Sequence, residues 1–304
     1  MENQTTVPYF LLLEFSKKRD LQLLHFFLFF ILYLAMAIAN LIIITAIAFD
    51  HHLHNPMYFF LMNLAMQDLG IASVIVPKSM INSLMDTRQI SYFGCVAQIF
   101  LFVTFEGFDL SLLTIMAYDR YVAICHPLHY EMVMNWEVCT KIVILVWVIS
   151  IIYGILHTTG TFSTPFCSNA INQFFCELPY LLKLSCFGFN LAEFGFLVIS
   201  IIAGLGCSVF IIVSYIMIFK AVLRISSVKG RQKAFSTCFP HLIIFCIFLV
   251  TSCLAYLRSP SNIPSYLDLT FTIPYSLLPP LFNPIIYSMM NEKIKSVLSK
   301  LWKV

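Results

Sequence analysis

The sequence predicts an all-α membrane protein: a bundle of seven transmembrane helices followed by a short amphipathic C-terminal helix. The 304 residues are 60% hydrophobic and 11% charged, whereas soluble domains average roughly 45–50% apolar and about 25% charged residues. Seven runs are each long and apolar enough to cross roughly 30 Å of bilayer hydrocarbon as a helix. These runs are continuously apolar, which favours helices over the shorter, alternating strands of a membrane barrel.

The seven expected spans follow one another with short connections and one long loop. They lie near residues 23–49, 57–84, 94–124, 138–160, 194–223, 234–257 and 267–289. The long loop is 161–193, and residues 291–302 have the pattern of an amphipathic helix lying on the membrane. No repeat, low-complexity tract or soluble domain is visible, so residues 1–304 are expected to form a single seven-transmembrane domain.

Charge distribution and one glycosylation sequence predict that residues 1–22 are extracellular and that 290–304 form a cytoplasmic tail. This orientation puts 11 of the 18 Lys and Arg residues in cytoplasmic segments and 7 outside, a modest positive-inside bias, although the basic cluster 17–19 opposes it. The one Asn-x-Ser/Thr sequence starts at Asn3, and glycans are added in the lumen. We therefore expect a multi-pass plasma-membrane protein with a glycan on Asn3.

Four of the ten cysteines are expected in an oxidising compartment. Cys167, Cys176 and Cys186 fall in the long loop, and Cys95 opens the third span, so all four would be luminal, where disulfides persist. Four cysteines allow three pairings, and the residues alone do not choose among them. The other six lie in spans or on the cytoplasmic side, where they are expected to be small apolar side chains.

Five blocks in order along the chain carry a family resemblance. They are PMYFFLMNLAMQDL (56–69), MAYDRYVAICHPLHY (116–130), FFCELPYLLKLSC (174–186), KAFSTCFPHL (233–242) and PPLFNPIIYS (279–288). In these blocks the chain resembles the vertebrate odorant (olfactory) receptors, which belong to the rhodopsin-like class of G-protein-coupled receptors. The resemblance implies disulfides between Cys95 and Cys176 and between Cys167 and Cys186.

The chain departs from the family pattern at a few positions that bear on activation more than on the fold. Ala65 replaces the usual Ser, Pro240 precedes His241 where Ser is usual, and Leu249 stands in place of an aromatic Tyr. Proline removes one helical hydrogen bond and can bend a helix. The seventh-span exit continues Met289-Met290-Asn291 instead of Leu-Arg-Asn.

An acid and a base lie side by side near the end of the third span. One interpretation of Asp119 and Arg120 is an interfacial anchor, because an Arg there can keep its charge in water. The resemblance implies a switch instead, in which Asp119 holds Arg120 at rest and Arg120 turns to a G protein on activation. The switch residues are then Asp119, Arg120, Tyr121, Tyr215, His241 and Tyr287. The foot of the sixth span, 228–233, has no acid, so Asp119 and packing must hold the resting state, and this basic foot is a cationic landing site for a partner.

Four polar residues lie in the middle of spans, where such side chains are functional by default. They are Asn40, Asp68, Asp109 and Asn283, and their counterparts in the family face one interior network. Two carboxylates there need a proton, a sodium ion or hydrogen bonds. Ion or water binding and a purely structural network both remain open.

Glu106 is the candidate selectivity residue of a ligand cavity. It lies one turn outward from Asp109 and shares a helix face with Phe102, Val103 and Gly107, and Gly107 would leave room beside it. The alternative is a carboxyl group bonded to a neighbouring span. The opposite walls are expected from Ile199, Ser200, Ala203, Gly204, Ser252, Cys253, Tyr256, Ile273 and Ser276. Such a mostly apolar pocket with few polar anchors suits a volatile or mildly amphipathic organic ligand.

The predicted function is therefore an odorant receptor that activates a stimulatory heterotrimeric G protein and raises cyclic AMP. Inverted repeats typical of a transporter are not visible, no catalytic constellation indicates an enzyme, and the seventh span has no Lys for a retinal Schiff base. A net charge of +3 is too small to suggest nucleic acid. Membrane lipid is the other expected partner. No cofactor or metal is expected, because His51, His52 and His54 fit a solvated loop better than a metal site.

Overall fold

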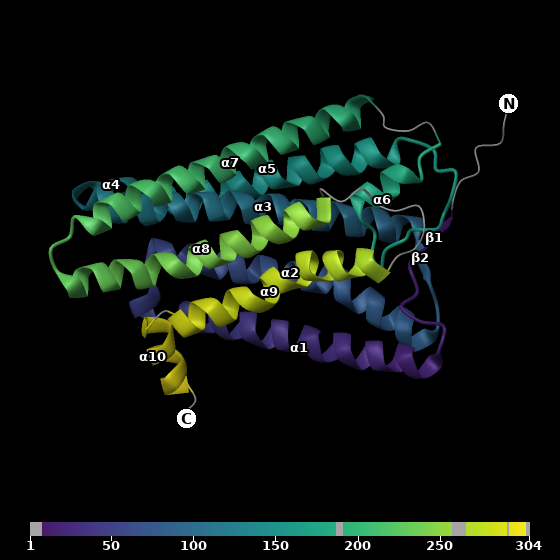
Figure 1. Ribbon diagram of the computed structural model, residues 1–304, viewed down its shortest axis with the longest axis horizontal. Helices are drawn as coiled ribbons and strands as arrows, with labels where there is room; N and C mark the ends of the chain where they lie inside the picture. The colour runs from purple at the N-terminus through teal and green to yellow at the C-terminus, as the bar shows by residue number, and fades with distance from the viewer. Residues whose placement is uncertain (1–7, 187–190, 257–265, 291, 302–304) are drawn as a thin grey trace.

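A computed structural model of the chain describes residues 8–186, 191–256, 266–290 and 292–301. Seven long helices form a bundle in this part of the chain (Figure 1). They are α1 (Arg19–Phe49), α2 (Pro56–Met85), α3 (Tyr92–Cys125), α5 (Trp136–Phe162), α7 (Leu191–Leu223), α8 (Val228–Tyr256) and α9 (Tyr266–Met290). Each covers most or all of an expected span, so the seven-helix fold is confirmed. Asn3 lies outside the described residues.

The helices begin where the sequence provides caps. Asn55 accepts a hydrogen bond from the Tyr58 amide at the start of α2, and Ser91 and Asn135 cap α3 and α5 in the same way. Such side chains satisfy backbone N–H groups that the first turn leaves unpaired. At the end of α2, Asp86 adopts a left-handed conformation with φ 52°. Short polar side chains therefore set the limits of the spans.

The two ends of the bundle differ. The cap end carries β1 (Tyr9–Leu11), β2 (Gln89–Ser91) and the loop segment 163–186, which contains α6 (Leu178–Lys183). The two strands are antiparallel, with Phe10 opposite Ile90. The foot end carries the 3₁₀ turns His51–Leu53 and Pro127–His129, α4 (Tyr130–Val133), the connection from α7 to α8, and α10 (Glu292–Leu301).

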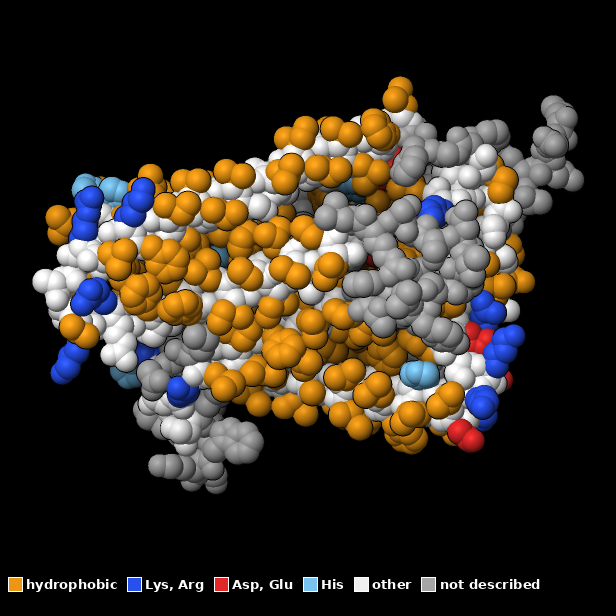
Figure 2. Space-filling view, viewed as in Figure 1, with side chains coloured by type: hydrophobic (Ala, Val, Ile, Leu, Met, Phe, Trp, Pro, Cys, Tyr) orange, Lys and Arg blue, Asp and Glu red, His pale blue; other side chains and the backbone are white. Residues whose placement is uncertain are grey.

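On the face shown in Figure 2, the surface between the two ends is largely apolar, and the Lys and Arg side chains lie mainly toward the ends. Among the described residues, six helices are apolar enough by composition to cross a membrane: α1, α2, α3, α5, α7 and α8. The seventh, α9, contains four prolines and packs against α1, α2 and α8. We assign α9 as a membrane span because of its position in the bundle, and not because of its hydropathy alone.

Three clusters of buried side chains fill the interior. Toward the foot end the core includes Leu64, Met116, Tyr215, Ile244 and Tyr287. Toward the cap end a second cluster joins α1, α2, α3 and α9 to the loop residues Phe174 and Phe175. A third packs β1 and β2 against α3 and the loop. The short α10 has the expected amphipathic pattern, because Ile294 is buried while Lys293 and Lys295 are exposed.

Candidate functional site

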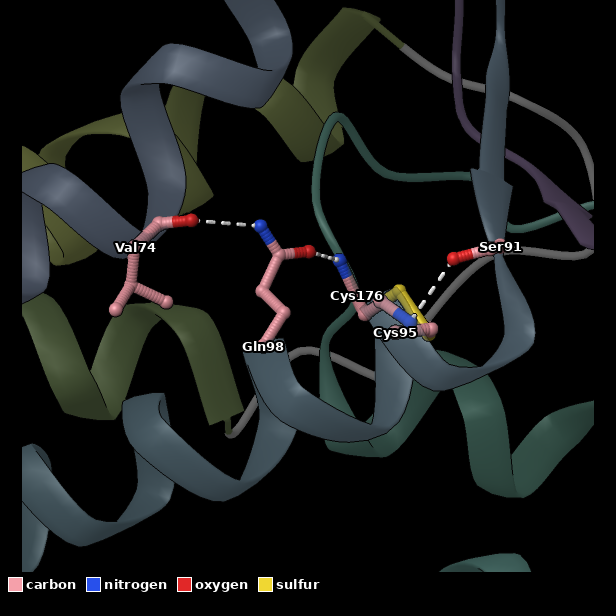
Figure 3. Close-up of a disulfide and its surroundings, with 6 residues drawn as sticks. Val74, Ser91, Cys95, Gln98 and Cys176 are labelled. Atoms are coloured by element: carbon pink, nitrogen blue, oxygen red, sulfur yellow. Dashed lines mark hydrogen bonds between the residues drawn. A yellow bond between two sulfur atoms is a disulfide. The ribbon is translucent and has the colours of Figure 1, made fainter.

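The long loop is fixed over the cap end by covalent and polar contacts. Disulfides join Cys95 to Cys176 and Cys167 to Cys186, the pairing that the resemblance implies. The side chain of Gln98 reinforces the first, because its Oε1 accepts from the Cys176 amide at 2.8 Å and its Nε2 donates to the Val74 carbonyl at 2.9 Å (Figure 3). The loop is thereby held to both α3 and α2.

Glu106 is bonded to a neighbouring helix beneath this loop. The Tyr275 hydroxyl of α9 donates to Glu106 Oε2 at 2.5 Å, as the alternative reading of Glu106 anticipates. Among the described residues, Oε1 of Glu106 has no hydrogen-bond partner. Phe102, only 2% exposed, packs its ring against Phe175 and Tyr275. The tyrosine therefore orients the carboxyl group, and one of its oxygens remains available.

Gly107 has a different role from the one expected. A Cβ atom at this position would lie 3.0 Å from the Tyr153 ring of α5. The space that glycine provides is thus occupied by a side chain of the neighbouring helix and does not open beside Glu106. Gly107 serves close packing between α3 and α5.

The residues expected to form a pocket wall on α7 lie only partly inside the bundle. Ile199 is 65% exposed, and Ala203 is exposed too. The face of α7 that packs into the bundle contains Ser200, half-buried Gly204 and buried Ile211. Ile199 and Ala203 lie to one side of that face, so the bundle does not enclose them.

The residues expected from α8 and α9 differ in burial. Cys253 is exposed and does not lie in an enclosed wall. Ser252 Oγ is buried without a partner among the described residues, which leaves it free for a ligand. Ser276 is buried but its hydroxyl donates to Thr272 O of its own helix, and Ile273 is half-buried. The side chain of Tyr256 lies outside the described part of the structure, and half-buried Val103 packs toward the loop cluster.

A buried acid–imidazole pair between α5 and α7 was not anticipated. His157 Nδ1 lies 2.9 Å from Glu193 Oε1, and His157 Nε2 lies 2.9 Å from Ser200 Oγ. Ser200 in turn donates to the Phe196 carbonyl at 2.7 Å. All three contacts are satisfied at once when the imidazole donates from both nitrogens. A histidine and a glutamate within apolar runs were the available sequence signal.

We expect Gly160→Ala to destabilise this pair. A Cβ atom at position 160 would collide with Glu193 Oε2, so the carboxyl group must move away from His157. Overpacking of this kind costs roughly 1–3 kcal/mol, and the purified protein should melt at a lower temperature in detergent. Gly195→Ala on α7 is the matched control, because nothing lies within 4 Å of its new Cβ. Equal melting temperatures for both variants would contradict the expectation.

The interior polar residues are only partly joined. Asn283 Nδ2 donates to both oxygens of Asp68 at 3.0 Å. Asn40 Nδ2 donates to the Met36 and Pro280 carbonyls, both at 3.0 Å. Among the described residues, Asp109 Oδ1 is buried without a partner. Asn40, Asp68 and Asn283 thus link α1 and α2 to α9, whereas Asp109 on α3 keeps an acceptor without a partner in the described part of the chain.

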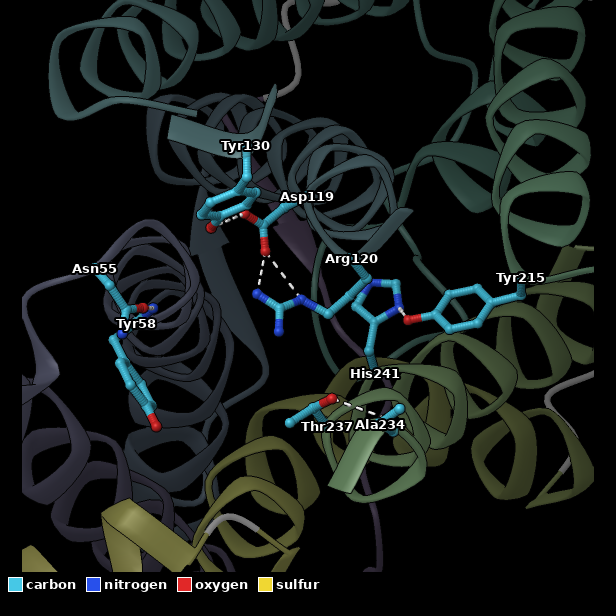
Figure 4. Close-up of polar contacts among 9 residues, drawn as sticks. All are labelled: Asn55, Tyr58, Asp119, Arg120, Tyr130, Tyr215, Ala234, Thr237 and His241. Atoms are coloured by element: carbon cyan, nitrogen blue, oxygen red, sulfur yellow. Dashed lines mark hydrogen bonds and ion pairs between the residues drawn. The ribbon is translucent and has the colours of Figure 1, made fainter. Parts of the chain in front are cut away.

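Arg120 is held by its neighbour at the foot end. Its guanidinium forms an ion pair with Asp119 Oδ2, through Nε at 2.9 Å and through Nη2. The Tyr130 hydroxyl of α4 donates to the other oxygen, Oδ1, at 2.7 Å (Figure 4). Burial, and then the Asp119 carboxylate, raise the pKa of Tyr130, so this donor keeps its proton. Both oxygens of Asp119 are engaged, and the guanidinium is drawn toward α4.

The other expected switch residues form separate contacts. Tyr215 OH lies 2.9 Å from His241 Nδ1 (Figure 4). His241 Nε2 lies 2.9 Å from the Leu113 carbonyl, so the ring donates there from Nε2. Tyr121 OH contacts His126 Nε2 at 3.1 Å. Among the described residues, the buried Tyr287 hydroxyl has no partner. Arg120, Tyr215 and Tyr287 are thus not bonded to one another in this conformation.

Comparisons with known proteins add to this geometry. A family model described as olfactory receptor matches residues 29–303. Olfactory receptor 14C36 of Homo sapiens is 47% identical over 304 residues, which cover 100% of this chain and 97% of that protein. Olfactory receptor 14A16 of Homo sapiens is 43% identical, with 100% and 98% covered. Squid rhodopsin has a similar fold, with a TM-score of 0.75 at 17% identity over 95% of this chain and 87% of that one.

Proposed function

The chain belongs to the olfactory receptor family, and we propose that it binds small, mostly apolar organic ligands within the bundle and activates a stimulatory heterotrimeric G protein. Activation then raises cyclic AMP. Multi-pass membrane insertion follows from the family and the apolar helices. The family consists of receptors, not enzymes.

The proposed orientation puts the cap end outside the cell and the foot end in the cytoplasm of the plasma membrane. Two disulfides at the cap end support this orientation, because disulfides persist in oxidising compartments. The excess of Lys and Arg in foot-end segments agrees with it. The proposal includes a glycan on Asn3.

The Tyr275–Glu106 contact is the observation that carries the ligand site. A carboxyl group fixed by one hydrogen bond presents its second oxygen at a defined position, which is how a mostly apolar pocket selects ligands. Half-buried Ser200 and the unpartnered Ser252 hydroxyl are further candidate anchors. The proposed ligand is a volatile organic molecule with one hydrogen-bonding group.

The interior network is a second proposed binding site. Buried acceptors on Asp109 and Asn40 without partners among the described residues, near the Asp68–Asn283 contact, have the oxygen chemistry that a sodium ion takes. These residues would hold the ion between α1, α2, α3 and α9. Such an ion would compensate two buried carboxylates.

Glu106→Gln should change which ligands activate the receptor. Cells expressing the wild-type chain or the variant are screened for cyclic AMP against a panel of volatile organics. Ligands that form a hydrogen bond with the Glu106 carboxyl group should lose potency by several-fold or more, as expected for the loss of one buried hydrogen bond. Apolar ligands should keep theirs.

Glu137→Gln is the matched control, because it removes an exposed acid whose ion pair is with Lys141 on the same helix. It should leave the ranking of ligands unchanged. An identical ranking in wild type and Glu106→Gln would exclude Glu106 from the pocket. The proposed coupling would be contradicted if the wild-type receptor reached the cell surface and no ligand of the panel raised cyclic AMP.

A further inference from the structure

A hollow of about 360 Å³ lies between α3 and α7 at the foot end. Tyr121 and Ile124 line it from α3, and Met217 and Ala221 line it from α7. Met217 is 48% exposed, so the hollow is open on the outer surface of the bundle. None of these side chains belongs to the ligand site, and of the expected switch residues Tyr121 alone lines the hollow.

Two cations form the lower rim of the hollow. Lys220 and Arg224 both line it and are exposed, and residues four apart lie on one face of a helix. Among the described residues, neither forms an ion pair, and no Asp or Glu lines the hollow. Two positive charges with no protein counterpart thus lie next to an apolar wall.

An apolar strip continues from the hollow toward the middle of the bundle. Tyr118 of α3 and Phe210 of α7 are 37% and 43% exposed, and their ring centroids lie 6.4 Å apart. Met217 lies two turns further along α7, at the hollow. The surface beside the strip is also apolar, because Val213 and Ile216 are exposed. A surface of this kind in a membrane protein contacts acyl chains.

We propose that this groove binds one anionic phospholipid of the cytoplasmic leaflet. The headgroup phosphate lies between Lys220 and Arg224, and an acyl chain follows the strip formed by Met217, Phe210 and Tyr118. A cationic rim at the membrane border beneath an apolar strip matches the charge order of a phospholipid, headgroup outside and chain inside. The inference rests on the proposed orientation of the chain and is independent of the odorant ligand.

The test uses the full chain in nanodiscs of phosphatidylcholine that contain a minor fraction of photoreactive phosphatidylserine. After illumination, mass spectrometry of peptides measures label on α3 and α7. The double variant Lys220→Gln/Arg224→Gln should lose label on the order of tenfold or more, since each cation near an anionic lipid contributes roughly fivefold. Photoreactive phosphatidylcholine should label both proteins equally weakly at this site.

Lys229→Gln/Lys233→Gln is the matched control. These two exposed lysines on α8 are also four residues apart but do not line the hollow, so the loss of charge is the same. Label in this variant should match wild type. An equal loss of label in both double variants would show diffuse attraction and overturn the proposal, as would full label in Lys220→Gln/Arg224→Gln.

A third variant tests the contribution of the lipid's acyl chain separately from that of its headgroup. Ala221→Phe fills the apolar part of the hollow and keeps both cations, so the label should fall. Soluble glycerophosphoserine, which lacks acyl chains, should not compete at the concentration of the lipid. Full competition by glycerophosphoserine would show that the site binds a soluble anion and would overturn the proposal of a phospholipid site. Each variant must melt at the wild-type temperature. A Gln variant that does not is replaced by the Ala variant at the same positions, and Ala221→Phe is replaced by Ala221→Leu.

Discussion

Replacing Arg120 with alanine is expected to abolish ligand-stimulated cyclic AMP while leaving the receptor measurable at the cell surface. Arg120 is the one cation of the α3 foot that the structure holds inside the bundle, with a side chain only 12% exposed. Its ion pair with Asp119 and the Tyr130 donor to the same carboxylate define a resting arrangement. The proposed active arrangement needs the guanidinium for contact with a G protein, and alanine cannot supply it.

The loss of signalling should not come from unfolding. Asp119 keeps the Tyr130 donor when Arg120 is removed. Its side chain is only 1% exposed and loses its counter-charge, so surface staining must show that folded receptor is still present. Lys141→Ala is the control for loss of one cytoplasmic cation, because its exposed pair with Glu137 contributes only about 0–1 kcal/mol. This variant should signal normally. Full signalling by Arg120→Ala at wild-type surface levels would disprove the switch.

A second contact must break when Arg120 moves. Tyr215, one of the hydroxyls expected to receive the active guanidinium, is engaged by His241, which is itself anchored to the Leu113 carbonyl of α3. Tyr287 is buried with a hydroxyl unpartnered among the described residues. The proposed transition therefore exchanges the Asp119–Arg120 and Tyr215–His241 contacts for new ones. In the proposed switch, these two contacts hold the resting state without an acid at the foot of α8.

The spans were predictable because the bilayer fixes their length and composition. Each helix begins within six residues of its predicted start. The largest deviations are at α1 and α8, where polar residues such as Arg19 and Lys229 extend the helix beyond the apolar run. The contact between Asp119 and Arg120 was also predictable, because the two residues are adjacent in the sequence near the end of a span. The pairing of the four cysteines was predictable from the family resemblance and not from the residues alone.

The ligand wall on α7 was not predictable from composition. This helix is apolar on all sides, and lipid is as apolar as the bundle interior, so periodicity does not reveal the inward face. Ile199 and Ala203 were consequently expected inside the bundle although they are exposed, whereas Ser200 is half-buried on the inward face. Contacts between helices decided the rest: Tyr153 occupies the space beside Gly107, and His157 and Glu193 meet only because α5 lies against α7. Such contacts join residues that are far apart in the sequence, so the sequence alone does not predict them.

Removal of the Cys95–Cys176 disulfide is expected to have the other large effect, loss of folded receptor from the cell surface. Both cysteines are fully buried, and the bond joins residues 81 positions apart. Loss of a native disulfide costs roughly 2–5 kcal/mol, a large part of the roughly 5–15 kcal/mol that stabilises a typical protein. Cys176→Ser should therefore release the loop from α3, and with it Phe174 and Phe175 from the core above Phe102.

Surface immunostaining and a melting curve in detergent measure this effect. Cys246→Ser is the matched control, because Cys246 is free and exposed on α8, and it should behave as wild type. The Gln98 contacts to the Cys176 amide and to Val74 remain in Cys176→Ser, so they decide how much of the loop stays in place. If that variant reached the surface and melted like Cys246→Ser, these two hydrogen bonds and the aromatic packing would be sufficient to close the cap end, and the disulfide would be dispensable.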